Sequence, residues 1–85
     1  MKATLRKADN SVLRVIGEST DIYALVNAIR KDIPIMLKEW GAENDFECCS
    51  RVWDYFDDAI IQLKVDPANA FWCGTGIASM MYIID

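Results

Sequence analysis

The sequence predicts an α+β fold, an antiparallel β-sheet of four to six strands packed against one long helix over about residues 19–40. Three observations lead to this prediction. Apolar residues recur at helical spacing over residues 22–40, which indicates one buried helix face. Turn sequences at Asp9-Asn10 and at Gly74-Thr75-Gly76 each separate two segments with strand character. At 85 residues the chain is expected to form a single domain, residues 1–85, with one core.

The first predicted element is a β-hairpin, with strands over residues 3–8 and 11–16 on either side of the two-residue turn Asp9-Asn10. Both residue types tolerate the positive φ that a tight hairpin turn requires. Across this hairpin we expect Leu5 to pair with Leu13 or Val15 on the side that faces the helix. Arg6 and Arg14 then point the other way, toward solvent or a partner.

The long helix is predicted from apolar residues whose spacing alternates between four and three. These residues are Ile22, Val26, Ile29, Ile33, Met36 and Trp40. Ser19 and Thr20 are candidate N-caps, and Gly41 stands where a residue with left-handed backbone often ends a helix. Pro34 interrupts the pattern and removes a backbone donor, so we expect a kink or a restart near Asp32 within one helical unit.

Residues 46–65 fit two alternatives. One is a helix whose single face holds Phe46, Cys49, Val52 or Trp53, Phe56, Ile60 and Leu63. The other is a pair of strands, because the segment is rich in β-branched and aromatic residues and residues 61–65 alternate with a period of two. We predict the strands, over residues 46–53 and 59–65.

The C-terminal part is predicted to complete the sheet. Asp66-Pro67-Ala68-Asn69 is a good turn sequence, with proline where its fixed φ is already correct. Strands over residues 70–73 and 77–84 then flank Gly74-Thr75-Gly76, a three-residue hairpin loop. This loop lacks the lysine of a phosphate-binding P-loop and the third glycine of a dinucleotide motif, so a turn accounts for it.

Charge is distributed unevenly along the chain. Residues 1–38 carry seven basic and four acidic residues, whereas residues 39–85 carry two and nine, so the halves have charges of +3 and −7 within the net −4. The acidic C-terminal half would repel a phosphate backbone and attract a basic protein surface. We therefore expect a protein partner with a basic surface and no direct contact with nucleic acid.

The cysteines and the hydropathy indicate a cytoplasmic protein. Cys48, Cys49 and Cys73 are an odd number and two are adjacent, which suits a reducing compartment better than a disulfide scaffold. Without histidine, three thiols do not supply an ordinary zinc site, and we expect no cofactor. Buried, inert thiols are the simpler interpretation, since a reactive one needs a cation and Arg51 is the candidate. No stretch approaches the roughly 20 apolar residues that span a bilayer, so we expect no membrane contact.

The segment from Glu43 to Asp58 is the candidate binding surface, because aromatic and acidic residues interleave there. Tyr and Trp are enriched at binding hot spots, and carboxylates around them would select a basic partner. Trp53 or Phe56 is expected to enter the core, which leaves Tyr55 available. The candidate partner-binding residues are Glu43, Asp45, Trp53, Asp54, Tyr55, Asp57 and Asp58.

These features predict a small acidic protein-interaction module that inhibits or regulates a basic-surfaced partner, for example a nucleic-acid enzyme. In size and charge alone the chain is similar to small inhibitors such as toxin-immunity proteins and phage-encoded inhibitors of host nucleases, including anti-CRISPR proteins. That class has no common fold, so the analogy assigns no residue. Enzyme activity is disfavoured, because a chain without histidine lacks the common triads.

Two alternatives come from other functional classes. One is a small-molecule binder with an aromatic pocket between helix and sheet or at a homodimer interface, lined by Trp40, Phe71, Trp72 and Met80. The other is a divalent-metal-dependent enzyme that uses the Asp54, Asp57 and Asp58 carboxylates, since hard cations accept clustered oxygen ligands.

Overall fold

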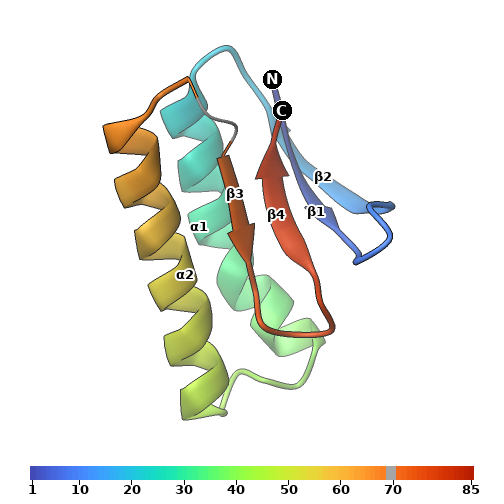
Figure 1. Cartoon of the computed structure of the whole chain (residues 1–85). Coiled ribbons are helices and arrows are strands. Elements are labelled where there is room, and N and C mark those ends of the chain that lie inside the picture. The colour runs from blue at the N-terminus through green and yellow to red at the C-terminus, as the bar shows by residue number, and fades with distance from the viewer. Residues whose placement is uncertain (69–70) are drawn as a thin grey trace.

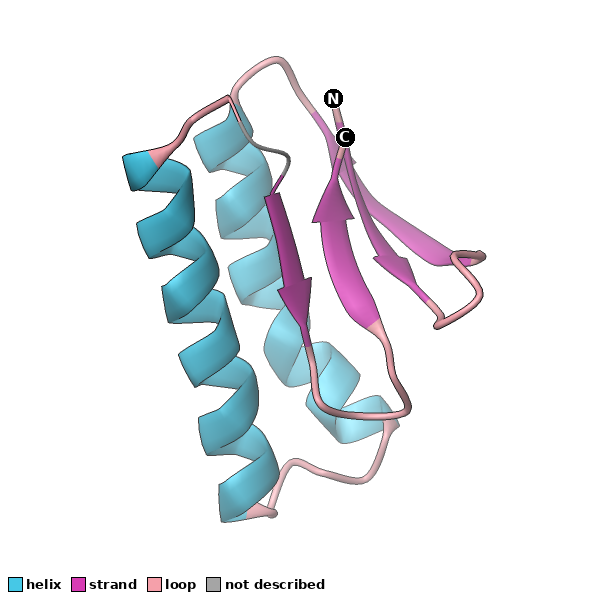
Figure 2. Cartoon of the chain, viewed as in Figure 1, coloured by secondary structure: helices cyan, strands magenta, loops and turns pink. Residues whose placement is uncertain are grey.

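The computed structural model describes residues 1–68 and 71–85, and it is a two-layer α+β structure (Figure 1). In chain order its elements are β1 (Lys2–Arg6), β2 (Val12–Glu18), α1 (Ile22–Glu39), α2 (Phe46–Val65), β3 (Phe71–Gly74) and β4 (Met81–Ile84). The strands form one antiparallel sheet in the order β2-β1-β4-β3, and both helices lie on the same face of it (Figure 2). The predicted class, α+β with an antiparallel sheet, is confirmed.

The two strands predicted over residues 46–53 and 59–65 are wrong, because this segment is the second long helix, α2. Burial decides it. Val52, Phe56 and Leu63 fall on one helix face and are buried, and this packing outweighs the β propensity of the individual residues. The alternation that suggested a strand arises because Ile61 and Val65 are exposed on the far side of the last turns.

Helix α1 agrees with its prediction over most of its length. The stripe residues Val26, Ile29, Ile33 and Met36 are buried against the sheet, together with Leu25 and Leu37, whereas Ile22 is partly buried and Trp40 is exposed. The helix is continuous through Pro34, so no restart occurs near Asp32.

The caps of α1 differ from the prediction at one end only. Asp21 is the N-cap in place of Ser19 or Thr20, and its carboxylate accepts a hydrogen bond from the Tyr23 N–H at 3.0 Å. At the other end Gly41 has the predicted left-handed backbone, with φ of 68°, and its N–H donates to the Lys38 carbonyl.

The β1–β2 hairpin contains two register shifts that change which side chains face the helices. Of the two predicted turn residues, Asn10 has the expected positive φ, whereas Asp9 does not. The shifts place Arg14 opposite Leu5, on the inner side, and leave Leu13 and Val15 exposed. The predicted pairing of Leu5 with Leu13 or Val15 is therefore wrong, because each bulge adds one residue and reverses the alternation beyond it.

The inward-pointing Arg14 joins a polar network that links strands to α1. Its guanidinium donates to Asp32 at 2.8 Å and also bonds Glu39. The buried Tyr82 hydroxyl of β4 donates to the same Asp32 oxygen at 2.8 Å. Arg14 is thus engaged within the fold and not presented to a partner.

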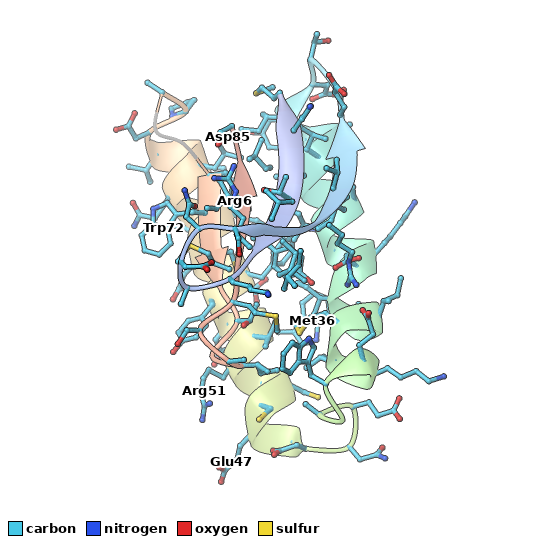
Figure 3. The ribbon with its side chains drawn as sticks, turned by 90° about the vertical axis from the view of Figure 1, so that its right-hand side faces the viewer. Arg6, Met36, Glu47, Arg51, Trp72 and Asp85 are labelled. Atoms are coloured by element: carbon cyan, nitrogen blue, oxygen red, sulfur yellow. The ribbon has the colours of Figure 1, made fainter. Side chains whose placement is uncertain are left out.

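On the outer sheet face Arg6 has an analogous structural role. Its guanidinium bonds Asp85 at 2.6 Å, near the C-terminus (Figure 3). The Arg6 Nε–H also donates to the Thr4 hydroxyl at 2.9 Å. This arrangement covers Thr4, which is buried although it belongs to the outer face.

The C-terminal hairpin has a longer loop than the three residues predicted. Residues 75–80 connect β3 to β4, and the buried Thr75 hydroxyl donates to the Met80 carbonyl and accepts from the Ile77 N–H. Of the predicted turn at 66–69, Asn69 lies outside the described residues, as does Ala70, the predicted first residue of the next strand. In the described part of the chain, neither helix has the length and apolar character needed to cross a membrane.

Candidate functional site

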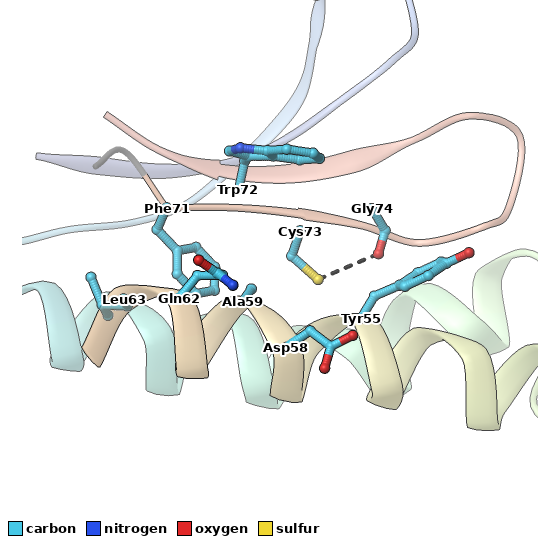
Figure 4. A pocket seen from close by; sticks show the side chains of 9 residues that line it. All are labelled: Tyr55, Asp58, Ala59, Gln62, Leu63, Phe71, Trp72, Cys73 and Gly74. Carbon is cyan, nitrogen blue, oxygen red and sulfur yellow. Dashed lines mark hydrogen bonds between the residues drawn. The ribbon is translucent and has the colours of Figure 1, made fainter. Parts of the chain in front are cut away.

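A cleft of about 770 Å³ lies between α2 and the edge strand β3 (Figure 4). It is lined by Tyr55, Asp58, Ala59, Gln62, Leu63, Phe71, Trp72, Cys73 and Gly74. The cleft exists because β3 is the last strand of the sheet and α2 packs beside it. A cleft of this size with a largely apolar lining is typical of a binding site.

The helix side of the cleft is one stripe of α2. Tyr55, Asp58, Ala59 and Gln62 recur at positions i, i+3, i+4 and i+7, so they lie in a row beside the buried face. Tyr55 is 43% exposed and Asp58 is exposed, which gives this side an aromatic ring and a carboxylate that solvent and a ligand can reach.

The strand side presents alternating faces of β3. Phe71 and Cys73 point toward the helices and are buried, and the Phe71 ring meets Phe56 edge-on at 6.4 Å. Trp72 lies on the opposite side of β3 from α2 and is 63% exposed (Figure 4). The cleft therefore has an apolar floor and an exposed indole at its rim.

Cys73 is held as a neutral thiol in this floor. Burial raises its pKa to about 12, and its Sγ donates a hydrogen bond to the Gly74 carbonyl at 3.3 Å. A thiol that keeps its proton at neutral pH is a poor nucleophile, which supports a structural role.

The structure brings two of the seven predicted partner-binding residues into the cleft, Tyr55 and Asp58. Asp54 and Asp57 are exposed on α2 but lie outside the cleft lining. Trp53 is half-buried and meets Phe56 edge-on with ring centroids 5.8 Å apart, so it supports the core.

The remaining two predicted residues lie just before α2. Glu43 is exposed in the connection between the helices, and Asp45 is the N-cap of α2, accepting from the Cys48 N–H at 3.1 Å. Hydrogen bonds from Cys48 lower the pKa of Asp45. Asp45 therefore has a structural role that the sequence pattern did not reveal.

Sequence reasoning missed the other helix residues of the cleft, Ala59, Gln62 and Leu63. The signal was present in the spacing from Tyr55 to Gln62, but it is recognisable only when residues 46–65 are treated as a helix. Assigning strands there placed these side chains on alternating faces, which separated them.

The aromatic pocket predicted for a small molecule is divided between two places. Phe71 and Trp72 belong to the α2–β3 cleft, whereas Trp40 and Met80 line a second cavity of about 340 Å³ that also includes Leu13. The four side chains therefore do not form one pocket.

The structure also shows how the acidic side chains and thiols considered as metal ligands are arranged. Within residues 1–68 and 71–85, no group of three or more His, Cys, Asp or Glu side chains is arranged to hold a metal ion. All three cysteines are free, and Cys73 alone is fully buried. A hydrogen bond with Asp45 is the largest cause of a raised pKa at Cys48, despite the opposite influence of Arg51.

Comparison of the chain with models of protein families, with curated proteins and with solved structures finds no match.

Proposed function

We propose that this chain is a small acidic protein-interaction module that binds a basic surface of a protein partner and thereby inhibits or regulates it. The observation that carries the proposal is the α2–β3 cleft, where α2 presents the exposed Tyr55 ring and the Asp58 carboxylate, and the exposed Trp72 indole lies at the rim on the other side of β3. Exposed aromatic side chains beside an acid are the groups that anchor a partner and select its charge.

The charge of α2 supports a basic partner. The helix carries the acids Glu47, Asp54, Asp57 and Asp58 against the bases Arg51 and Lys64. A concentration of carboxylates speeds association with a positive surface and opposes a phosphate backbone. The partner is accordingly a protein, and a nucleic-acid enzyme is a suitable class because its substrate-binding surface is basic.

The proposal is tested by capturing proteins from the native host on immobilised wild type and on three variants. Tyr55→Ala and Asp58→Lys should lose the captured partner, whereas Glu18→Lys, an exposed acid at the end of β2, should retain it. Capture should weaken as salt rises, because screening acts on exposed charges. A partner retained equally by all variants, or one captured equally well at high salt, would contradict the proposal.

A small-molecule binder is the second candidate, and the cleft volume is the observation that favours it. About 770 Å³ lies within the range of known ligand pockets, although the cleft is open along the strand edge. A metabolite that binds there should raise the melting temperature saturably, and Tyr55→Ala should lower its affinity. If no compound raises the melting temperature, the small-molecule candidate fails and binding of a protein partner remains the proposed function.

A further inference from the structure

We propose that the partner docks in an extended conformation as a fifth strand on the free edge of β3, with a Lys or Arg side chain opposite Asp58. This inference rests on the proposed function, because it specifies how the same cleft holds its partner. Three observations carry it: the direction of the backbone groups of β3, the state of the two sheet edges, and the charge of α2.

The first observation is the phase of the hydrogen bonds across the sheet. Lys2 and Asp85 exchange two backbone bonds, of 2.7 and 3.0 Å, between β1 and the end of β4. Because such pairs alternate in antiparallel sheets, Tyr82 and Ile84 direct their backbone groups toward β3 instead. The Thr75 N–H, which donates to the Met80 carbonyl at 3.1 Å, follows the same phase.

The same alternation determines which backbone N–H and C=O groups are exposed along the outer edge of β3. Phe71 and Cys73 pair with Ile84 and Tyr82, so the backbone N–H and C=O groups of Trp72 and Gly74 point away from β4. They point toward the side where the cleft lies. An extended chain presents complementary groups at this spacing, and strand addition satisfies them.

The second observation is the difference between the two edge strands. The β2 edge contains both register shifts of the β1–β2 pair, and such bulges disturb the regular ladder that an added strand needs. The β3 edge pairs with β4 in unbroken register. The regular edge is therefore the one that borders the cleft.

The geometry also predicts the side chains of the added strand. The residue that pairs with Trp72 shares its outer face and lies beside the exposed indole. In the added strand, the residues before and after this one point to the opposite face of the sheet. That face is toward the α2 stripe of Tyr55, Asp58 and Gln62. One of those neighbours should be Lys or Arg, because the carboxylate of Asp58 is exposed there.

The third observation, charge, favours a basic partner segment over a second copy of this chain. Edge-to-edge pairing of two β3 strands would bring a second acidic α2 near the first. Like charges at such an interface oppose association. A basic segment meets the same carboxylates favourably.

The experiment uses the full chain and a display library of random twelve-residue linear peptides. Selected peptides should be rich in Lys or Arg and should lose affinity about tenfold with Asp58→Asn. Asp57→Asn is the matched control, because it removes the same charge from the same helix outside the cleft, and affinity should change less than about twofold.

Two readouts on the best peptide test the strand itself. N-methylation of single peptide amides should abolish binding at two positions that lie two residues apart, since only the peptide residues opposite Trp72 and Gly74 direct their N–H groups toward β3. Hydrogen exchange of the Trp72 and Gly74 amides should slow at least about tenfold on saturation, because both then donate to the peptide. No selected peptide, loss without alternation, or unchanged exchange at both amides would overturn strand addition.

The outcomes separate this inference from the proposed function. If capture of the host partner depends on Tyr55 and Asp58 but N-methylation shows no alternation, the cleft binds a partner in another conformation and only strand addition fails. If sedimentation shows a dimer in which the Trp72 and Gly74 amides are protected without peptide, the edge pairs with a second copy and the inference is overturned. If peptides add as strands but no host partner depends on the cleft, the proposed function fails.

Discussion

At the scale of single residues, the fold depends on one buried carboxylate. Asp32 lies in α1 but accepts hydrogen bonds from Arg14 of β2 and from Tyr82 of β4, both at 2.8 Å. Burial of a charge is costly unless it is paired and hydrogen-bonded. These two contacts offset the free-energy cost of burying the Asp32 charge, and they hold α1 in position against the sheet.

Tyr82→Phe tests this network. It removes the hydroxyl that donates to Asp32 from a side chain that is fully buried, so we expect the free energy of unfolding to fall by about 2 kcal/mol. Urea denaturation measures the change. Tyr55→Phe is the matched control, because the exposed Tyr55 lies at the cleft rim and its variant should unfold like the wild type. Equal stability of the two variants would show that the Asp32 contact is not stabilising.

The thiol in the cleft floor predicts a loss of stability at alkaline pH. Burial raises the pKa of Cys73 from 9.0 to about 12. Below pH 9 both the folded and the unfolded states keep the proton, whereas between pH 9 and 12 only the unfolded state releases it, so unfolding becomes easier. Denaturant titrations over this range should show a smaller decline for Cys73→Ala than for wild type, and parallel declines would contradict the assignment.

At the scale of elements, α1 was predictable and α2 was not. The spacing of residues 22–36 satisfies only a helix, because the buried stripe agrees with the period of 3.6 and nothing competes with it. In residues 46–65, local propensity favoured strands, and the exposed Ile61 and Val65 imitated an alternating pattern. Contact with β3 and the core, which the sequence does not display, decides between the two.

The buried stripe of α1 gives a direct comparison on one helix. Ile29→Asp places a charge without a partner in the core, where Ile29 has no exposed surface, and we expect a loss of more than about 4 kcal/mol. Ile35→Asp is the matched control, since Ile35 is exposed on the same helix and its change should cost less than about 1 kcal/mol. Thermal unfolding measures both, and a cooperative melt of Ile29→Asp near the wild-type midpoint would show that this face is not the core.

Pro34 provides a test in which a substitution is expected to raise stability. It is exposed within the continuous α1, where it supplies no N–H for the Arg30 carbonyl. Pro34→Ala restores that donor, and we expect the free energy of unfolding to rise by about 2 kcal/mol, less any gain in unfolded-chain entropy. Unchanged or lower stability in urea would indicate that the proline already fits the helix without cost.

At the scale of the whole molecule, the uneven charge could be predicted from the sequence, whereas the cleft could not. The excess of acids between Glu43 and Asp58 was readable from composition, and so was the aromatic content of that segment. The cleft includes Tyr55 and Trp72, which are distant in sequence and line one cleft only because β3 ends the sheet beside α2. Strand order is a property of long-range pairing, which no local pattern specifies.

Chemical-shift mapping tests the claim that the α2–β3 cleft is the surface that binds a basic partner. Backbone amide spectra of the labelled chain are recorded while the captured partner, or the best selected peptide, is added. We predict that the shifts concentrate at residues 55–63 and 71–74, with Asp57→Asn giving the same map and Asp58→Asn a weaker one. Shifts concentrated instead on the exposed residues of β2, Val12 and Val15, with residues 55–63 and 71–74 unchanged, would contradict the claim.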